Sequence, residues 1–186
     1  MHFNEHSNLA GQHAFLSASK YSWINYNEDK IDRVYIAALA ARHGTELHAF
    51  AHDAIRLGVK LPKTLKTLHM YVNDAIGFRM TSEQILYYSD VAFGTADTIA
   101  FRRNKLRISD LKTGVTQTSE KQLEVYAALF CLEYRIKPFD IDTELRIYQN
   151  DEVRVYEADP DSIMHIMSKI IAFNKRIQEL RQELEL

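Results

Sequence analysis

The chain has 186 residues, 46% hydrophobic and 26% charged, which is typical of one compact soluble domain and excludes a disordered or fibrous protein. Its net charge of −2 excludes nucleic-acid binding through bulk positive charge, so a nucleic-acid enzyme would need a local basic groove. A single cysteine, Cys131, excludes an internal disulfide and any four-cysteine metal site. Because there is no apolar run of about 18 residues and no leader-like start, we expect a cytoplasmic protein without membrane contact.

The N-terminal part, residues 1–77, is expected to be largely helical. An aromatic and polar segment, LSASKYSWINY, comes first, and a helical pattern follows it to about residue 57. A second helix, LKTLHMYVNDAIGF, is expected to end near Gly77. The side chains that stand out in the first segment are those of Ser17, Ser19, Trp23 and Tyr26.

The spacing of the hydrophobic residues then changes from a helical pattern to a strand pattern. Residues 85–158 predict a catalytic sheet with one helix. Four segments are short and rich in β-branched and aromatic residues: ILYYSDVAFGTADTIAF, KLRISDLKT, DIDTELRIYQ and EVRVYEA. The strong helix SEKQLEVYAALFCLEYR lies between the second and the third of them. The order predicts a single α+β domain, 1–186, with a mixed or antiparallel sheet flanked by helices.

The C-terminal helix, residues 161–186, carries apolar residues at spacings of three and four. This seam consists of Ile163, Ile166, Ile170, Phe173, Ile177, Leu180 and Leu184. It fits equally an amphipathic helix lying on the domain's own core and a coiled coil between copies of the chain. The charged end, KRIQELRQELEL, favours an oligomer, because it is longer than a small core could cover.

Residues 94–114, GTADTIAFRRNKLRISDLKTG, predict a β-hairpin that turns at RRNK. If the turn is centred between Arg103 and Asn104, Asp97 lies directly across from Asp110. Two carboxylates at cross-strand distance repel each other, so the pair is destabilising unless a positive charge lies between them. Lys112 lies two residues beyond Asp110 and shares its face of the strand.

Such a set suits phosphodiester cleavage, which uses hard oxygen ligands for Mg²⁺ or Mn²⁺ and a lysine that orients or deprotonates the attacking water. The competing interpretation is a salt-bridge cluster on an exposed sheet face, which is the commoner fate of an isolated D-x-K. Nearby basic residues, Arg102, Arg103, Lys105, Arg107 and Lys121, could form a DNA-contacting groove. They could equally be a solvated hairpin tip.

Four blocks together resemble the PD-(D/E)xK nuclease superfamily, and specifically its RecB-like exonuclease branch, which includes the CRISPR adaptation nucleases and many phage exonucleases. GTELH is similar to a helical G-x-x-x-H motif, and GTAD and DLK are similar to the second and third motifs. QLEVY is similar to the branch's Gln-x-x-x-Tyr motif. The blocks run in the family's order from residue 44 to residue 126, the central half of the chain.

The resemblance implies a restriction-endonuclease-like fold and a metal-dependent deoxyribonuclease. Its metal ligands would be His48, Asp97, Asp110 and the backbone carbonyl of Leu111. The catalytic residues would be Asp97, Asp110, Lys112, Gln122 and Tyr126, with Arg102, Arg103, Lys105 and Lys121 as candidate DNA contacts. One or two Mg²⁺ or Mn²⁺ ions would be the cofactor. No iron–sulfur cluster is expected, because the cysteines that hold it in some members are absent.

Several of these residues have plainer interpretations. Gln122 could belong to a capping box with Ser119 as N-cap, and Tyr126 could be a core aromatic. His48 and His52 are four apart and could hold zinc, although HAFAH lacks the glutamate of a metalloprotease motif. Glu46 is expected to point to a different face of the helix from His48.

The expected function is a DNA exonuclease acting in DNA processing or recombination, in the manner of a phage-encoded, stand-alone module with no motor of its own. The alternatives are a structure- or sequence-selective endonuclease on the same fold and a non-catalytic DNA-binding or assembly subunit. DNA, a recombination protein and a second copy of the chain are the expected partners. Strand preference and polarity do not follow from the sequence.

Overall fold

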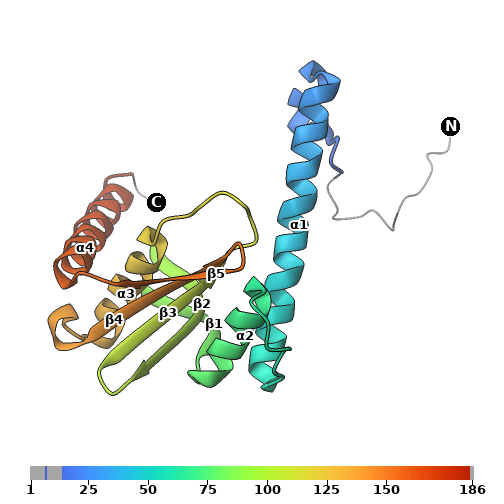
Figure 1. The fold of residues 1–186 in the computed structure, drawn as a ribbon. Coiled ribbons are helices and arrows are strands. Elements are labelled where there is room, and N and C mark those ends of the chain that lie inside the picture. Colours follow the sequence, from blue (N-terminus) through green and yellow to red (C-terminus); the bar gives the residue numbers. More distant parts are fainter. Residues whose placement is uncertain (1–6, 8–13, 185–186) are drawn as a thin grey trace. The chain divides into compact units, whose positions relative to one another are not determined.

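The computed structural model describes residue 7 and residues 14–184 (Figure 1). Residues 185 and 186, the end of the expected C-terminal helix, lie outside the described residues. The chain divides into two units, residues 1–43 and 44–186, where the sequence suggested one domain. Helix α1, Glu28–Leu57, contains the boundary.

Within the first unit, a 3₁₀ segment, η2 (Ala18–Asn25), precedes α1. It forms from the aromatic and polar segment that stands out in the sequence. The Ser17 hydroxyl accepts a hydrogen bond from the Ser19 amide at its start, and the Tyr26 amide donates to the Trp23 carbonyl at its end. Both ends of η2 are therefore closed by local hydrogen bonds.

The second unit is built on one five-stranded sheet in the order β1-β2-β3-β4-β5. The strands are β1 (Thr81–Ser89), β2 (Ala92–Arg102), β3 (Lys105–Leu111), β4 (Asp142–Gln149) and β5 (Glu152–Glu157). Neighbours pair antiparallel except β3 and β4, which are parallel. The connection between these two contains α3 (Lys121–Tyr134) and η3 (Pro138–Asp140). The α+β class with a mixed sheet is therefore confirmed, and the first expected strand segment, 85–101, contains two strands.

The β2–β3 hairpin has the register that the sequence predicted. Thr98 pairs with Ser109 and Arg102 with Lys105. Arg103 and Asn104 form the turn with φ values of 50° and 58°, the left-handed conformation of tight hairpin turns. Asp97 and Asp110 are the next residues of the two strands beyond the Thr98–Ser109 pair, so the same register sets them opposite each other.

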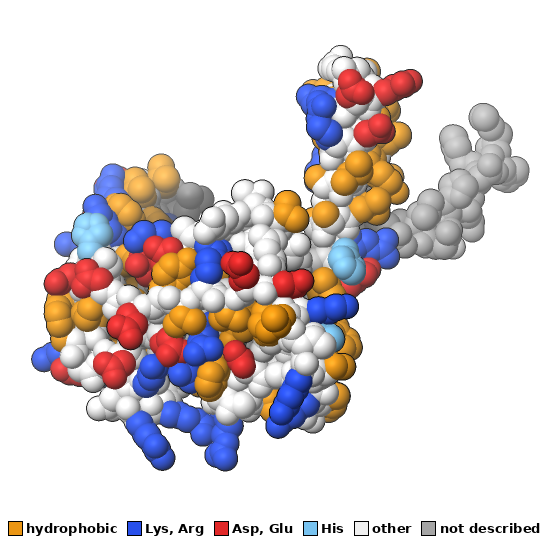
Figure 2. Space-filling model, viewed as in Figure 1, with side chains coloured by type: hydrophobic (Ala, Val, Ile, Leu, Met, Phe, Trp, Pro, Cys, Tyr) orange, Lys and Arg blue, Asp and Glu red, His pale blue; other side chains and the backbone are white. Residues whose placement is uncertain are grey.

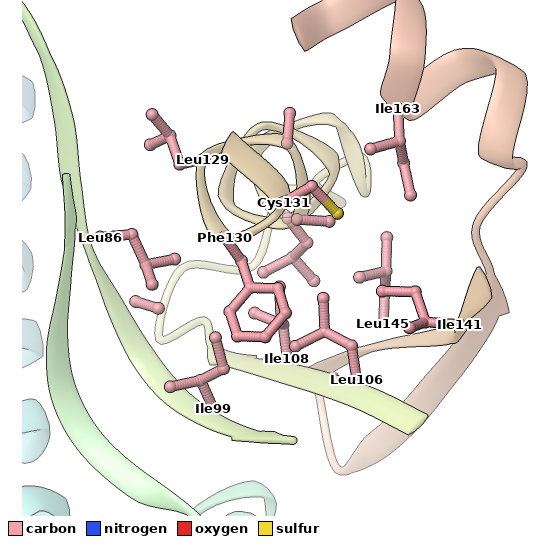
Figure 3. Close-up of a cluster of buried hydrophobic side chains, with 14 of the residues drawn as sticks. Leu86, Ile99, Leu106, Ile108, Leu129, Phe130, Cys131, Ile141, Leu145 and Ile163 are labelled. Atoms are coloured by element: carbon pink, nitrogen blue, oxygen red, sulfur yellow. The ribbon is translucent and has the colours of Figure 1, made fainter. Parts of the chain in front are cut away.

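The sheet is packed by two hydrophobic clusters. The first joins the strands to α3 and to Ile163 of α4 (Pro160–Glu183) (Figure 3). The second joins the end of α1 and α2 (Thr67–Gly77) to Leu111 and Tyr148. Helix α2 ends at Gly77, as expected. Because the clusters lock α1, α2 and α3 against the same strands, side chains from all of these elements can meet at one end of the hairpin.

Helix α4 uses the first half of its apolar seam on its own domain. Ile163 is fully buried, and Ile166 and Ile170 pack against the first cluster. Farther along, Phe173 and Leu184 are exposed. The interpretation as a core-covering helix is thus confirmed for the first half, while self-association remains a prediction for the second. Over the described part of the chain, no helix combines the length and the apolar character needed to cross a membrane.

Candidate active site

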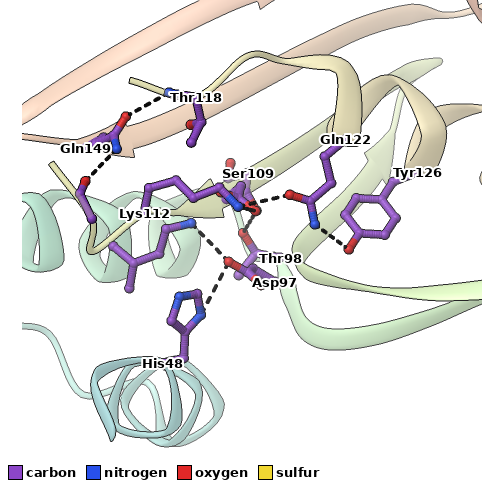
Figure 4. Close-up of polar contacts among 12 residues, drawn as sticks. His48, Asp97, Thr98, Ser109, Lys112, Thr118, Gln122, Tyr126 and Gln149 are labelled. Atoms are coloured by element: carbon purple, nitrogen blue, oxygen red, sulfur yellow. Dashed lines mark hydrogen bonds and ion pairs between the residues drawn. The ribbon is translucent and has the colours of Figure 1, made fainter. Parts of the chain in front are cut away.

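Asp97 of β2 faces His48 of α1 (Figure 4), and its charge acts on Asp110 of β3. An Asp97 carboxylate oxygen, Oδ2, accepts a hydrogen bond of 3.0 Å from the backbone amide of Leu111. His48 Nδ1 lies 3.4 Å from the same oxygen. The backbone amide and the histidine ring therefore fix the Asp97 carboxylate in place.

Asp110 is buried, with 3% of its surface exposed, so it does not belong to a surface salt-bridge cluster. Lys112 Nζ donates to Asp110 Oδ1 at 3.1 Å. The second oxygen, Oδ2, lies 3.0 Å from the same ammonium, yet it is buried and has no hydrogen-bond partner. Burial and then the nearby Asp97 charge raise the pKa of Asp110 to about 6, against the opposing effect of Lys112 and His48.

A chain of hydrogen bonds leads from Lys112 to α3. Lys112 Nζ donates to Gln122 Oε1 at 2.9 Å, and Gln122 Nε2 donates to the Tyr126 hydroxyl at 3.0 Å. The capping-box interpretation is wrong, because the N-cap of α3 is Glu120 and has no side-chain cap. The Tyr126 ring also packs on the core, so it is at once a core aromatic and a partner of Gln122. The spacing of four on α3 puts both side chains on one face of the helix, where Tyr126 holds Gln122 against Lys112.

His48 and His52 have different partners. His52 Nδ1 lies 2.9 Å from the hydroxyl of Ser82 on β1, whereas His48 faces Asp97. Four residues before His48, Gly44 lies against Thr113: a Cβ at Gly44 would stand 2.7 Å from the threonine hydroxyl. A glycine at this position thus lets α1 approach the segment that carries Lys112.

A divalent cation fits the donor atoms at this place. Over residues 7 and 14–184, no three His, Cys, Asp or Glu side chains are already gathered as a metal site. However, the Asp110 and Asp97 carboxylates together carry two negative charges, and the single positive charge of Lys112 neutralises only part of them. Carboxylate and carbonyl oxygens with one imidazole are ligands that Mg²⁺ and Mn²⁺ accept.

Gln149, at the end of β4, holds the segment that follows Lys112, and the sequence analysis missed it. Its amide donates to the carbonyls of Gly114 (2.6 Å) and Thr116 (2.8 Å). Arg154 of β5 binds Gln149 Oε1 (3.0 Å) and the Thr118 carbonyl (3.0 Å). No sequence signal reveals this role, because a glutamine ending a strand is usually an ordinary polar residue.

The basic residues of the hairpin are divided between solvent and ion pairs. Arg102 and Arg103 are exposed at the turn, five and six residues beyond Asp97. Lys105 pairs with Glu144 (2.7 Å) and Lys121 with Glu124 (2.8 Å). On the face shown in Figure 2, Lys and Arg side chains are interspersed with Asp and Glu over the sheet. A DNA-contacting role for these residues remains a prediction.

Glu144, at the other end of the β3–β4 pair, is surrounded by cations. Arg107, Arg146 and Lys105 contact its two oxygens at 2.5–2.7 Å. The guanidinium groups of Arg107 and Arg146 also lie over the Phe78 ring, 3.7 and 4.6 Å from its centre. Burial alone would raise the pKa of Glu144, but these hydrogen bonds outweigh it and hold that pKa far below its usual value. The negative charge of Glu144 is therefore fully neutralised by cationic side chains of the protein.

Comparison with known proteins gives no relatives: no family model, no curated protein and no solved structure matches this chain significantly.

Proposed function

We propose that the chain is a Mg²⁺- or Mn²⁺-dependent DNA nuclease with a restriction-endonuclease-like fold, most similar to RecB-like exonucleases. The observation that carries the proposal is Asp110: a buried carboxylate, one oxygen of which is ion-paired with Lys112 but accepts no hydrogen bond, close enough to a second carboxylate, Asp97, for its charge to raise the pKa of Asp110. Keeping the buried Asp110 carboxylate close to the partly buried Asp97 carboxylate costs free energy, and a bound cation would offset that cost.

His48, Asp97 and Asp110, with the Leu111 carbonyl, are the residues that would hold the ion. When bound, the ion would neutralise the carboxylates and favour ionisation of water near pH 7. Hydrolysis adds water to phosphorus and breaks the bond to the leaving sugar oxygen, which takes up a proton.

Lys112 is the residue placed to orient the attacking water. Its ammonium group is held between Asp110 and Gln122, so its direction is set before any substrate arrives. Tyr126 fixes the Gln122 amide in turn, which makes Gln122 and Tyr126 positioning residues for the lysine. The leaving-group proton would come from water.

The test is digestion of end-labelled linear and closed-circular DNA in Mg²⁺, Mn²⁺ or EDTA. We expect cleavage of linear DNA alone, lost in EDTA and in the variants Asp110→Asn and Lys112→Gln. Matched controls are Asp142→Asn and Lys63→Gln, which change an exposed aspartate and an exposed lysine outside the site and should cleave like the native chain.

Each alternative predicts its own outcome. Cleavage of the closed circle would show that the enzyme is an endonuclease. Cleavage of RNA alone would show that its substrate is RNA and not DNA. If no substrate is cut and neither metal ion raises the melting temperature, the proposal fails, and a non-catalytic DNA-binding or assembly role takes its place.

A homo-oligomer through the outer half of α4 is a further part of the proposal. Truncation at Asp161 would not test it, because Ile163, Ile166 and Ile170 belong to the core. The double variant Phe173→Glu, Leu184→Glu changes exposed positions only. We expect light scattering to give an oligomer for the native chain and a monomer for the variant; a native monomer would contradict the idea.

A further inference from the structure

The first unit contains a cavity that the proposed active site does not use. The segment from Ala14 to Tyr26 and Val34 of α1 enclose about 450 Å³. This is within the range of small-ligand pockets in proteins. The cavity is also the place where the aromatic and polar residues of the sequence motif come together.

Aromatic rings form the apolar wall of the cavity, and local contacts hold them in place. Trp23 and Tyr26 are half-buried, and the Trp23 indole N–H donates to the Ser17 carbonyl at 2.9 Å. The Phe15 ring meets the Tyr35 ring edge-on, with centroids 5.0 Å apart. Rings fixed in this way lose little freedom when a flat ligand stacks on them.

The polar wall suits an anion. Among the described residues that line the cavity, Lys20 is the one charged side chain and none is a carboxylate. Hydroxyl groups accompany it: Ser17 and Ser19 lie 2.8 Å apart through their hydroxyl oxygens, and Ser22 lies 3.3 Å from the Tyr26 hydroxyl. A lysine with several hydroxyl groups is a common set of phosphate ligands.

We propose that this cavity binds one nucleotide of the nucleic-acid strand, with the base against the Trp23 side and the phosphate at Lys20 and the serine hydroxyls. Among ligands that combine a flat ring with an anionic group, a nucleotide matches both walls, and base stacking on aromatic rings works for every base. The identity of the ligand rests on the proposed nuclease function. Binding itself requires no cleavage.

Trp23 is the only tryptophan of the chain, so its fluorescence reports on this cavity alone. The experiment titrates the full-length protein in EDTA with thymidine, thymidine monophosphate, inorganic phosphate and a 5′-phosphorylated oligothymidine. We expect the monophosphate and the oligonucleotide to quench Trp23. Thymidine should bind about tenfold more weakly, since it lacks the charge-assisted contact. Inorganic phosphate should compete with the monophosphate.

Lys20→Gln should weaken binding of the monophosphate about tenfold and leave thymidine unchanged. Lys63→Gln removes an exposed lysine of the other unit, and Tyr21→Ala removes an exposed aromatic side chain outside the cavity lining. Both should bind like the native chain. Circular dichroism of each variant checks that the helices are intact.

Two results would overturn the proposal: no quenching by the monophosphate or the oligonucleotide, or equal binding of thymidine and its monophosphate that Lys20→Gln does not change. Because the titration contains EDTA, a chain that proves inactive on DNA can still bind here. Conversely, a chain that cleaves DNA but shows no quenching would refute the cavity and leave the active site standing.

Discussion

The parallel strands β3 and β4 carry two buried carboxylates with opposite surroundings. Glu144 meets three cations and has a lowered pKa, whereas Asp110 meets one lysine and a second carboxylate and has a pKa raised to about 6. Burial raises the pKa of both residues, so burial alone does not explain why the two pKa values shift in opposite directions. The number of positive partners does, and it separates the fully paired carboxylate of Glu144 from that of Asp110, which we propose takes part in binding a metal ion.

The largest effect should come from Asp110→Asn. Removing a charged ligand from the proposed metal site should lower cleavage on the order of 1,000-fold, because electrostatic groups of this kind dominate catalysis. The same change should stabilise the metal-free protein at pH 8 by on the order of 1–3 kcal/mol, since asparagine carries no charge to bury. Urea unfolding in EDTA and the digestion assay measure the two effects on one preparation.

The sign of the pH dependence follows from the raised pKa of Asp110. Its ionised form is penalised in the folded state, so the native chain loses stability as pH rises from about 4, the unfolded pKa, through about 6. The advantage of Asp110→Asn should therefore be full at pH 8 and vanish below pH 4. An advantage that is the same at both values would mean that charge is not the cause.

Glu144→Gln should have the opposite effect on stability. It leaves Arg107, Arg146 and Lys105 without their shared carboxylate and should cost about 2–4 kcal/mol at pH 7. Because the folded pKa of Glu144 is lowered, its contribution is present above the unfolded pKa of about 4.3 and is lost as pH falls toward the folded pKa. The difference from the native chain should accordingly shrink at pH 3, and cleavage by the folded variant at pH 7 should stay native-like.

Gln149→Met should affect the proposed active site without touching Asp110. The methionine fills the same space but cannot bind the Gly114 and Thr116 carbonyls, so the segment after Lys112 should loosen. We expect cleavage to fall about tenfold, mainly in kcat, because Lys112 is then less well oriented. Gln117→Met alters an exposed glutamine of the same segment and should leave the rate unchanged. Equal losses in both variants would indicate a general effect on the segment.

The smallest effect concerns a buried hydroxyl oxygen that has no hydrogen-bond partner. Thr143 Oγ1 is buried beside Glu144 without a hydrogen-bond partner. Thr143→Val should be neutral or stabilise by up to about 1 kcal/mol, with no change in cleavage. Thr98→Val is the matched comparison: the Thr98 hydroxyl donates to the Ser109 carbonyl at 3.3 Å, so its loss should destabilise the fold. Calorimetric melting of both variants measures the difference, and a destabilised Thr143→Val would show that its hydroxyl has a partner in solution.

The parts of the molecule that the sequence predicts are those with short-range signals. The β2–β3 turn is an example: Arg103 and Asn104 fix the register, and the register places Asp97 and Asp110. The helical spacing of Gln122 and Tyr126 likewise predicts their shared face. Both inferences depend on local patterns: the two turn residues in the first case and a spacing of four on one helix in the second.

The features that escaped prediction depend on contacts between distant segments. The turn between β1 and β2 at Asp90 lacks the glycine or asparagine that marks such turns, so the sequence pattern predicts one segment where the structure has two strands. The parallel pairing of β3 with β4 joins residues separated by a helix. The support that Gln149 gives to Gly114 spans 35 residues, and no local pattern encodes it.

The hairpin has a consequence for how the protein folds. Asp97, Asp110, Lys112, Gln122 and Tyr126 all lie within thirty residues of sequence, and the first two come together once the two arms of one hairpin have paired. Contacts between close neighbours in sequence form early, so the repulsion of the two carboxylates would be met at the start of folding rather than at its end. His48 alone joins from a remote helix. If the proposed metal ion binds these carboxylates, it would then act on the first part of the sheet to form, and would also speed folding of the site.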